Sequence, residues 1–326
     1  MKKKLFTFLM TLILLTGSGT WAQAQTKGTH TFRLGDNQFW LDDKPFQIIS
    51  GEIHPSRIPA EYWKQRIQMI KAMGCNTVAC YIMWNYHESE PGVFDFQTGN
   101  KNLEKFIQTV QDEGMFLLFR PGPYVCGEWD FGGLPPYLLS IPDIKIRCMD
   151  TRYTAAVERY VDKIAPIIKK YEITNGGPII MVQVENEYSS YATDKPYVAA
   201  VRDLVRESGF TDVPLFQCDW SSNFTNNALD DLIWTVNFGT GANIDQQFKK
   251  LKELRPETPL MCSEFWSGWF DHWGRKHETR PAKDMVQGIK DMLDRNISFS
   301  LYMTHGGTTF GHWGGANNPA YSAMCS

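Results

Sequence analysis

Two glutamates lie just beyond very apolar segments, where a carboxylate is costly unless it has a task. Glu187 lies beyond the run IIMVQV at 179–184, and Glu264 follows PLMCS at 259–263. A charge near such runs is unfavourable without a partner or a chemical role. Two carboxyl groups can cleave a glycosidic bond: one protonates the departing oxygen, while the other attacks the anomeric carbon or activates water.

The same residues allow simpler interpretations. Each glutamate could instead form an ion pair with Arg120 or with another base. Glu185 rivals Glu187, because it lies two residues away and on the same side of an ideal strand. The residues by themselves leave this choice open.

Short apolar runs alternate with amphipathic segments, which is typical of βα units around a parallel sheet. After a hairpin at 30–34 and 39–41, we expect eight strands, at 46–53, 77–82, 115–119, 179–184, 213–217, 232–238, 260–263 and 297–303. Seven helices should link these strands, including segments ending at Gly74 and Gly114 and a long helix at 151–171, kinked at Pro166. This pattern predicts a (β/α)8 TIM barrel.

Catalytic groups of such barrels lie at the carboxyl ends of the strands. The residues at these ends are His54, Trp84, Asn85, Arg120, Asn186, Glu187, Asp219, Trp220, Asn237, Glu264 and His305. Strands four and seven should face each other across the barrel. Their glutamates could then approach to about 5 Å, the separation of a retaining glycosidase.

Several longer motifs occur in order along the chain. They are SGEIH at 50–54, TVACYIMWNYHE at 77–88, RPGPYVCGEW at 120–129, GGLP at 132–135, QVENEY at 183–188, SEFWSGW at 263–269 and YMTHGGT at 302–308. With these motifs the chain resembles glycoside hydrolase family 35, the β-galactosidases of the clan A (β/α) barrels. The resemblance implies a retaining exo-glycosidase that removes terminal non-reducing β-D-galactose by double displacement.

The resemblance also implies roles for individual residues. Glu187 corresponds to the acid/base, Glu264 to the nucleophile, and Asn186 to the group that binds the sugar 2-hydroxyl. The positions that would hold other galactose hydroxyls are Tyr81, Cys126, Gly127 and Glu128, and those of the aromatic wall are Trp266, Trp269 and Tyr302. This chemistry requires no metal and no cofactor. A different β-linked sugar, such as glucosamine, and an inert carbohydrate-binding relative are the alternatives.

The two ends of the chain are expected to differ from a complete catalytic barrel: the first residues precede the barrel, and the last elements of the barrel are missing. Three lysines at 2–4, an apolar run at 5–15 and Ala22-Gln23-Ala24 predict a signal peptide at 1–25 and export to the periplasm or beyond. The barrel at 26–326 would lack its final helix and the C-terminal β-sandwich domains of the family. We therefore expect an exposed apolar outer face on strand eight, including Phe299, Leu301 and Met303 or the residues that alternate with them.

Bulk properties limit the partners. A net charge of −3 gives no general attraction to nucleic acid or to an anionic membrane, and the N-terminal apolar run is too short for a stable anchor. β-Galactoside oligosaccharides or glycoconjugates are the expected partners. The seven cysteines are dispersed, so one or two disulfides are conceivable but a disulfide framework is not.

Overall fold

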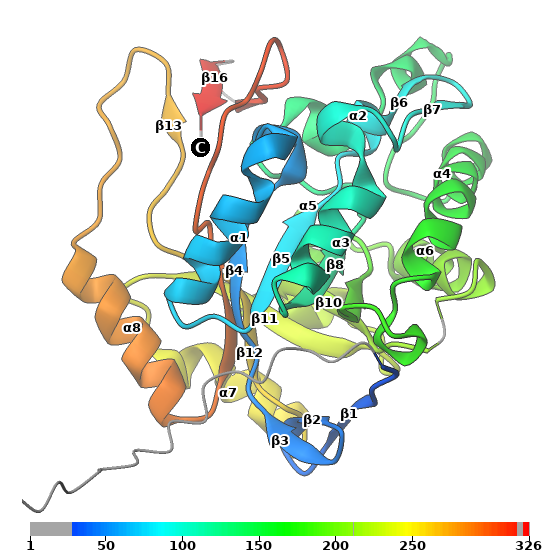
Figure 1. The fold of residues 1–326 in the computed structure, drawn as a ribbon. Coiled ribbons are helices and arrows are strands. Elements are labelled where there is room, and N and C mark those ends of the chain that lie inside the picture. Colours follow the sequence, from blue (N-terminus) through cyan, green and yellow to red (C-terminus); the bar gives the residue numbers. More distant parts are fainter. Residues whose placement is uncertain (1–27, 211, 318–321, 326) are drawn as a thin grey trace, which may run out of the picture.

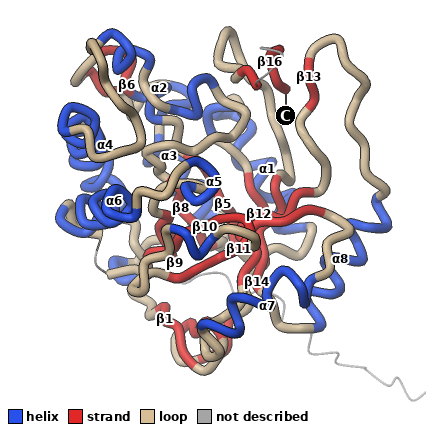
Figure 2. Tube along the Cα trace, turned by 180° about the vertical axis from the view of Figure 1, so that it is seen from behind, coloured by secondary structure: helices blue, strands red, loops and turns tan. Residues whose placement is uncertain are grey.

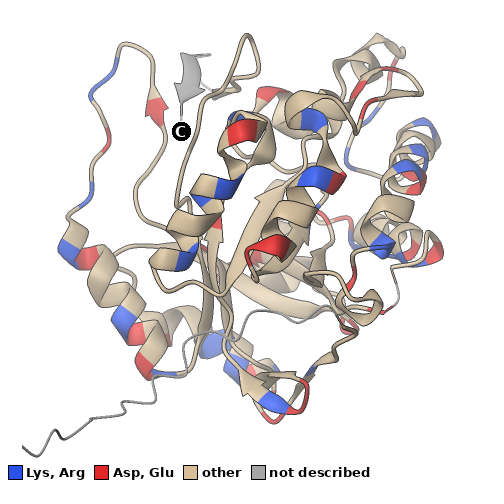
Figure 3. Cartoon of the chain, in the orientation of Figure 1, with Lys and Arg blue, Asp and Glu red and all other residues tan. Residues whose placement is uncertain are grey.

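A computed structural model describes residues 28–210, 212–317 and 322–325. The predicted signal peptide at 1–25 lies outside the described residues. Within them, none of the helices has the length and apolarity needed to cross a membrane. Figure 3 shows acidic and basic residues interspersed along the outer helices.

Eight parallel strands close into a barrel, which confirms the predicted (β/α)8 fold (Figures 1 and 2). In order around the barrel they are β4 (Ile49–Glu52), β5 (Thr77–Tyr81), β8 (Phe116–Arg120), β9 (Ile179–Gln183), β10 (Leu215–Trp220), β11 (Ile233–Gly239), β12 (Met261–Trp266) and β14 (Ser298–Tyr302). The pairing of β14 with β4 closes the ring, with Leu301 opposite Gly51. Because all strands are parallel, their carboxyl ends meet at one mouth.

Six longer helices connect successive strands in the described chain: α1 (Trp63–Ala72), α3 (Leu103–Asp112), α4 (Thr151–Lys169), α6 (Lys195–Glu207), α7 (Ile244–Leu254) and α8 (Ala282–Asp294). Asparagine or aspartate side chains cap the start of α3, α4, α6 and α7 by accepting backbone N–H bonds. Gly74 and Gly114 follow α1 and α3 with φ of 94° and 67°, values that favour glycine. Two short helices, α2 (Trp84–His87) and α5 (Tyr188–Tyr191), lie in loops after strands.

Two details of the prediction are wrong. The first strand was expected to run continuously over 46–53, but β3 (Lys44–Phe46) leaves it to pair with β2 (Gln38–Leu41) and β1 (Phe32–Gly35) in a small separate sheet. Seven linking helices were expected, but β10 and β11 are joined by only a short 3₁₀ turn, Phe224–Asn226. Only twelve residues separate those strands, and their three asparagines favour turns over helix.

The expected exposure of strand eight is also wrong at two positions. Phe299 and Leu301 are 1% and 4% exposed, because they pack into a cluster with Phe265 of β12 and Met292 of α8. The chain after β14 folds back over the seam with β4, where the Thr304 hydroxyl donates to the Glu52 carbonyl at 2.9 Å. Met303 is half-buried and lines the barrel-mouth pocket instead.

Glu172 is an unusual buried carboxyl group near the amino end of β9, where it pairs with Ile179. It follows α4, it is fully buried, and neither carboxylate oxygen has a hydrogen-bond partner among the residues that the structure describes. Burial, reinforced by the charge of Asp212, raises the pKa of Glu172 from 4.5 to about 7. The pKa of Glu172 is higher in the folded protein than in the unfolded chain. The free energy of unfolding therefore falls as pH rises from about 4.5 through 7.

Glu172→Gln should therefore stabilise the protein at pH 8 by about 1–3 kcal/mol, because the amide removes the cost of ionising this buried carboxyl, roughly 1.4 kcal/mol for each pH unit by which its pKa is raised. The gain should shrink toward pH 5, where the wild-type carboxyl is already protonated. Thermal unfolding at both pH values measures this, with the exposed Glu253→Gln as the matched control. An equal change at pH 5 and pH 8 would contradict the assignment.

Candidate active site

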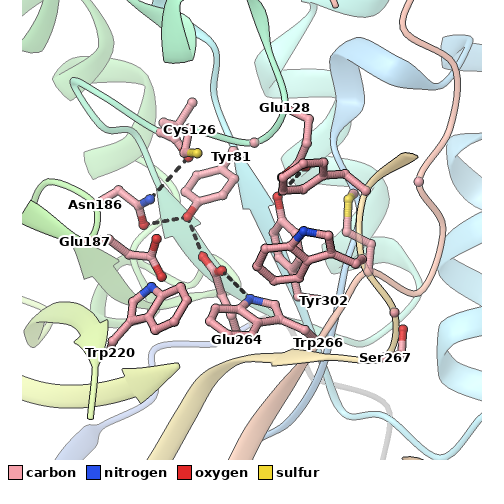
Figure 4. A pocket seen from close by; sticks show the side chains of 17 residues that line it. Tyr81, Cys126, Glu128, Asn186, Glu187, Trp220, Glu264, Trp266, Ser267 and Tyr302 are labelled. Atoms are coloured by element: carbon pink, nitrogen blue, oxygen red, sulfur yellow. Dashed lines mark hydrogen bonds between the residues drawn. The ribbon is translucent and has the colours of Figure 1, made fainter. Parts of the chain in front are cut away.

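One cavity of about 410 Å³ opens at the carboxyl ends of the strands (Figure 4). Every residue to which the resemblance gave a catalytic or binding role lines it: Tyr81, Cys126, Gly127, Glu128, Asn186, Glu187, Glu264, Trp266, Trp269 and Tyr302. They come from five different strands or from the loops that follow them. The barrel thus brings together groups separated by more than two hundred positions in the chain.

Seven further lining residues were not assigned from the sequence: Val125, Trp220, Ser267, Gly268, Phe270, Met303 and Gly306. Trp220 was predicted to lie at a strand end, and it ends β10 just as Trp266 ends β12, but no role was assigned to it from the sequence. The others lie in loops whose course no strand pattern determines. Sequence reasoning also missed the buried groups behind the wall, which bind the lining side chains rather than the cavity.

Glu264 is surrounded by hydrogen-bond donors. The Tyr81 hydroxyl lies 2.6 Å from Oε1, the Trp266 indole N–H donates to Oε2 at 3.0 Å, and the Arg120 guanidinium forms an ion pair with Oε1. These donors match an ionised carboxylate, which only accepts hydrogen bonds. The ion pair with Arg120 considered from the sequence is therefore present, and it lies inside the pocket wall.

Arg120 is shared between two carboxyl groups. Its guanidinium also binds Glu52 of β4 and donates to Gln183 of β9 at 2.6 Å. Burial raises the pKa of Glu52 to about 7, although the adjacent Arg120 charge opposes this. Because its pKa is raised, Glu52 carries less negative charge near neutral pH than an ordinary carboxyl group, which leaves more of the Arg120 charge to Glu264.

Glu187 has a very different environment. Its backbone adopts a left-handed conformation (φ 45°) at the start of α5, and its side chain accepts one hydrogen bond, from Asn237 Nδ2 at 2.9 Å. Burial, followed by the charge of Glu264, raises the pKa of Glu187 to about 8. Glu187 is therefore protonated at neutral pH and can donate a proton.

Glu185 lies outside the pocket, contrary to the expectation that it shares a side with Glu187. Regular strand β9 ends at Gln183, and the φ of Glu185 is 59°, so the alternation of an ideal strand does not continue. Its carboxylate forms a two-pronged ion pair with Arg147, at 3.0 and 2.6 Å. Tyr197 of α6 donates to it at 2.9 Å. The charge of Glu185 is thus already engaged away from the cavity.

Asn186 is linked to Glu264 through the Tyr81 hydroxyl, which lies within hydrogen-bond distance of both. Its side-chain oxygen accepts from Gln183 Nε2 and from the Cys218 thiol, each at 3.1 Å, and lies 2.6 Å from the Tyr81 hydroxyl. Tyr81 has one proton and two acceptors at equal distance. Because the Asn186 oxygen has other donors, Tyr81 can give its proton to Glu264.

The opposite wall carries a second acidic group. Cys126, Gly127 and Glu128 are consecutive left-handed residues, and this turn lets all three line the pocket. Burial raises the pKa of Glu128 to about 7, and the Tyr302 hydroxyl lies at 3.5 Å from its carboxylate. Arg57 supports the turn by donating to the Gly127 carbonyl at 2.5 Å.

Aromatic rings form the rim. The Trp220 and Trp266 rings are 5.1 Å apart, and Trp266 meets Trp269 edge-on at 5.6 Å. Such rings offer apolar faces that suit the C–H face of a sugar. Within the described residues, His, Cys, Asp and Glu do not come together in threes as metal ligands would. All six cysteines whose side chains are described are unpaired.

A parallel barrel with two unlike glutamates in its mouth is the arrangement of the barrel glycoside hydrolases. Residues 38–326 match the pattern of glycosyl hydrolases family 35. The chain belongs to this family.

Similar proteins agree with this membership. The chain is 41% identical over 314 residues to a beta-galactosidase of Mus musculus, covering 95% of this chain and 48% of that protein. It is 42% identical over 296 residues to a beta-galactosidase of Xanthomonas manihotis, covering 91% and 49%. It thus spans about half the length of these relatives. A solved beta-D-glucuronidase of Dictyoglomus thermophilum shares the fold, with a TM-score of 0.59, 14% identity, and coverage of 90% and 49%.

The raised pKa of Glu187 yields a direct test. Carbon-13 NMR of labelled glutamate should show one carboxyl titrating near pH 8, and Glu264→Gln should lower that pKa because a neighbouring negative charge is removed. Glu185→Gln serves as the control, since Glu185 is held by Arg147, and it should leave the titration nearly unchanged. A Glu187 pKa near 4.5 in the wild type would refute this description.

Proposed function

We propose that this chain is the catalytic barrel of a retaining exo-β-galactosidase, with Glu264 as nucleophile and Glu187 as acid/base. The observation that carries the proposal is the pair of unlike glutamates in one pocket. Glu264 is surrounded by donors, and Glu187 has a pKa raised to about 8. Family membership and the names of the relatives support galactosides as substrates.

In the first step Glu264 attacks the anomeric carbon and forms a covalent galactosyl-enzyme. Glu187 gives its proton to the departing oxygen as the glycosidic bond breaks. Tyr81 and Arg120 hold the nucleophile during this step, since both contact its Oε1. The Glu264 charge disappears when the new bond forms.

In the second step Glu187 becomes the base. Loss of the Glu264 charge removes a cause of its raised pKa, so Glu187 can stay ionised and take a proton from water. The water attacks the anomeric carbon and releases Glu264. Two inversions give net retention.

The remaining lining residues bind the sugar. Asn186 would hold the 2-hydroxyl, while Tyr81, Cys126, Gly127 and Glu128 would meet other hydroxyls. Trp266, Trp269 and Tyr302 would form the wall against which the ring packs. A cavity of about 410 Å³ suits one terminal sugar and part of its aglycone, which supports exo-cleavage.

We also propose that the protein is exported. The support is the charged, apolar and small-residue pattern of residues 1–25. Extracellular or periplasmic galactosides would then be its substrates.

Hydrolysis of 4-nitrophenyl β-galactoside should release β-galactose first. Proton NMR of the earliest product distinguishes the anomers before they equilibrate. The α-anomer as first product would refute the double displacement. Parallel assays with β-glucoside and β-glucosaminide test the sugar, and a preference for either would refute galactose specificity.

Replacement of each glutamate should give a distinct defect. Glu264→Gly should lower turnover on the order of 10⁴-fold or more, and azide should restore part of it as α-galactosyl azide. Glu187→Gly should still release activated leaving groups, and azide should give the β-azide. Glu185→Gln is the matched control. If it mimics the Glu187 variant while Glu187→Gln stays active, the acid/base assignment is wrong.

A further inference from the structure

Strand β12 contains one residue more than its neighbours at the site. On one side Val236 and Asn237 of β11 pair with Cys262 and Glu264, so Ser263 is the extra residue. The pairing with β14 shifts within the same stretch. Such a bulge lets neighbouring side chains take directions that a regular strand forbids. Here both Ser263 and Glu264 make contacts at the barrel mouth.

Ser263 begins a chain of hydrogen bonds that ends on Glu187. The Thr235 and Ser263 hydroxyl oxygens are 2.6 Å apart, and Ser263 donates to Asn237 Oδ1 at 2.8 Å. Asn237 Nδ2 then donates to Glu187 Oε1 at 2.9 Å. Thr235, Ser263 and Asn237 are each at most 2% exposed. Because Ser263 occupies the amide oxygen, the amino group must face Glu187.

We propose that Asn237, held by the Ser263 bulge, is a positioning residue that keeps the acidic proton of Glu187 on Oε2. In a protonated carboxyl group the carbonyl oxygen accepts hydrogen bonds better than the hydroxyl oxygen does, so the Asn237 donor on Oε1 favours the form with the proton on Oε2. Oε2 has no hydrogen-bond partner among the described residues and is free to donate to a leaving oxygen. This inference rests on the proposed role of Glu187 as acid/base.

The same contact has a consequence for pH dependence. Glu264 and Asp219 raise the pKa of Glu187, while the Asn237 hydrogen bond and the Arg120 charge lower it. Removing the Asn237 donor should therefore raise that pKa. The basic limb of the pH profile of kcat/KM should move to higher pH, because that limb reports the acid in the free enzyme.

Leaving-group dependence tests the positioning directly. In Asn237→Ala and the nearly isosteric Asn237→Asp, kcat/KM for methyl β-galactoside should fall about tenfold or more, as part of the 10²–10⁴ that acid catalysis supplies. The 2,4-dinitrophenyl galactoside needs little protonation, so its rate of glycosylation should change little. Ser263→Ala should shift both readouts in the same direction and by less. Asn175→Ala, an exposed asparagine below the barrel, is the control.

Glu187→Gln separates the two proposals. If it slows both substrates equally, the acid role of Glu187 fails, whatever Asn237 does. If it discriminates between them while folded Asn237→Asp retains the wild-type ratio and the wild-type basic limb, the positioning proposal is overturned. Thermal unfolding of each variant shows which ones are folded, and Asn237→Asp keeps the acceptor for Ser263 if Asn237→Ala does not fold.

Discussion

Two carboxyl groups that share a buried pocket cannot both be ionised without a large repulsion, and the surroundings of this site are arranged around that constraint. Arg120, Tyr81 and Trp266 all approach Glu264, so the negative charge resides there. Glu187 has one neutral donor and stays protonated. The difference between the two groups is produced by their neighbours, since both side chains are the same amino acid.

The neighbours are themselves held by charges outside the cavity. Arg120 is fixed between Glu52 and Gln183, and Glu185 is held by Arg147. Arg120 and Glu185 therefore each have a buried partner, which offsets the cost of burying their charge. Glu185 illustrates the benefit, because the third glutamate of this region adds no negative charge to the pocket itself.

Much of the barrel could be predicted, because buried parallel strands appear in the sequence as apolar runs that are followed by polar residues. Glu187 and Glu264 stood out for that reason, and the family motifs supplied the residues that we propose bind the sugar. The remaining features depend on local backbone geometry, which cannot be derived from the types of residues alone. Regular strand β9 ends at Gln183, so the two-residue alternation of a strand predicted the wrong side for Glu185. The asparagine-rich link before β11 was too short for a helix. The burial of Phe299 depended on contacts from α8.

The bulge in β12 determines which side chains of the strand face the core and which face the pocket. Up to Cys262 the alternation is regular, and beyond it Phe265 packs into the core while Trp266 reaches the pocket. Loss of one residue here would exchange those two faces, placing an indole in the core and a phenyl ring at the pocket wall. Single-residue insertions and deletions should consequently be far rarer in this stretch than substitutions, although the neighbouring loops tolerate changes in length.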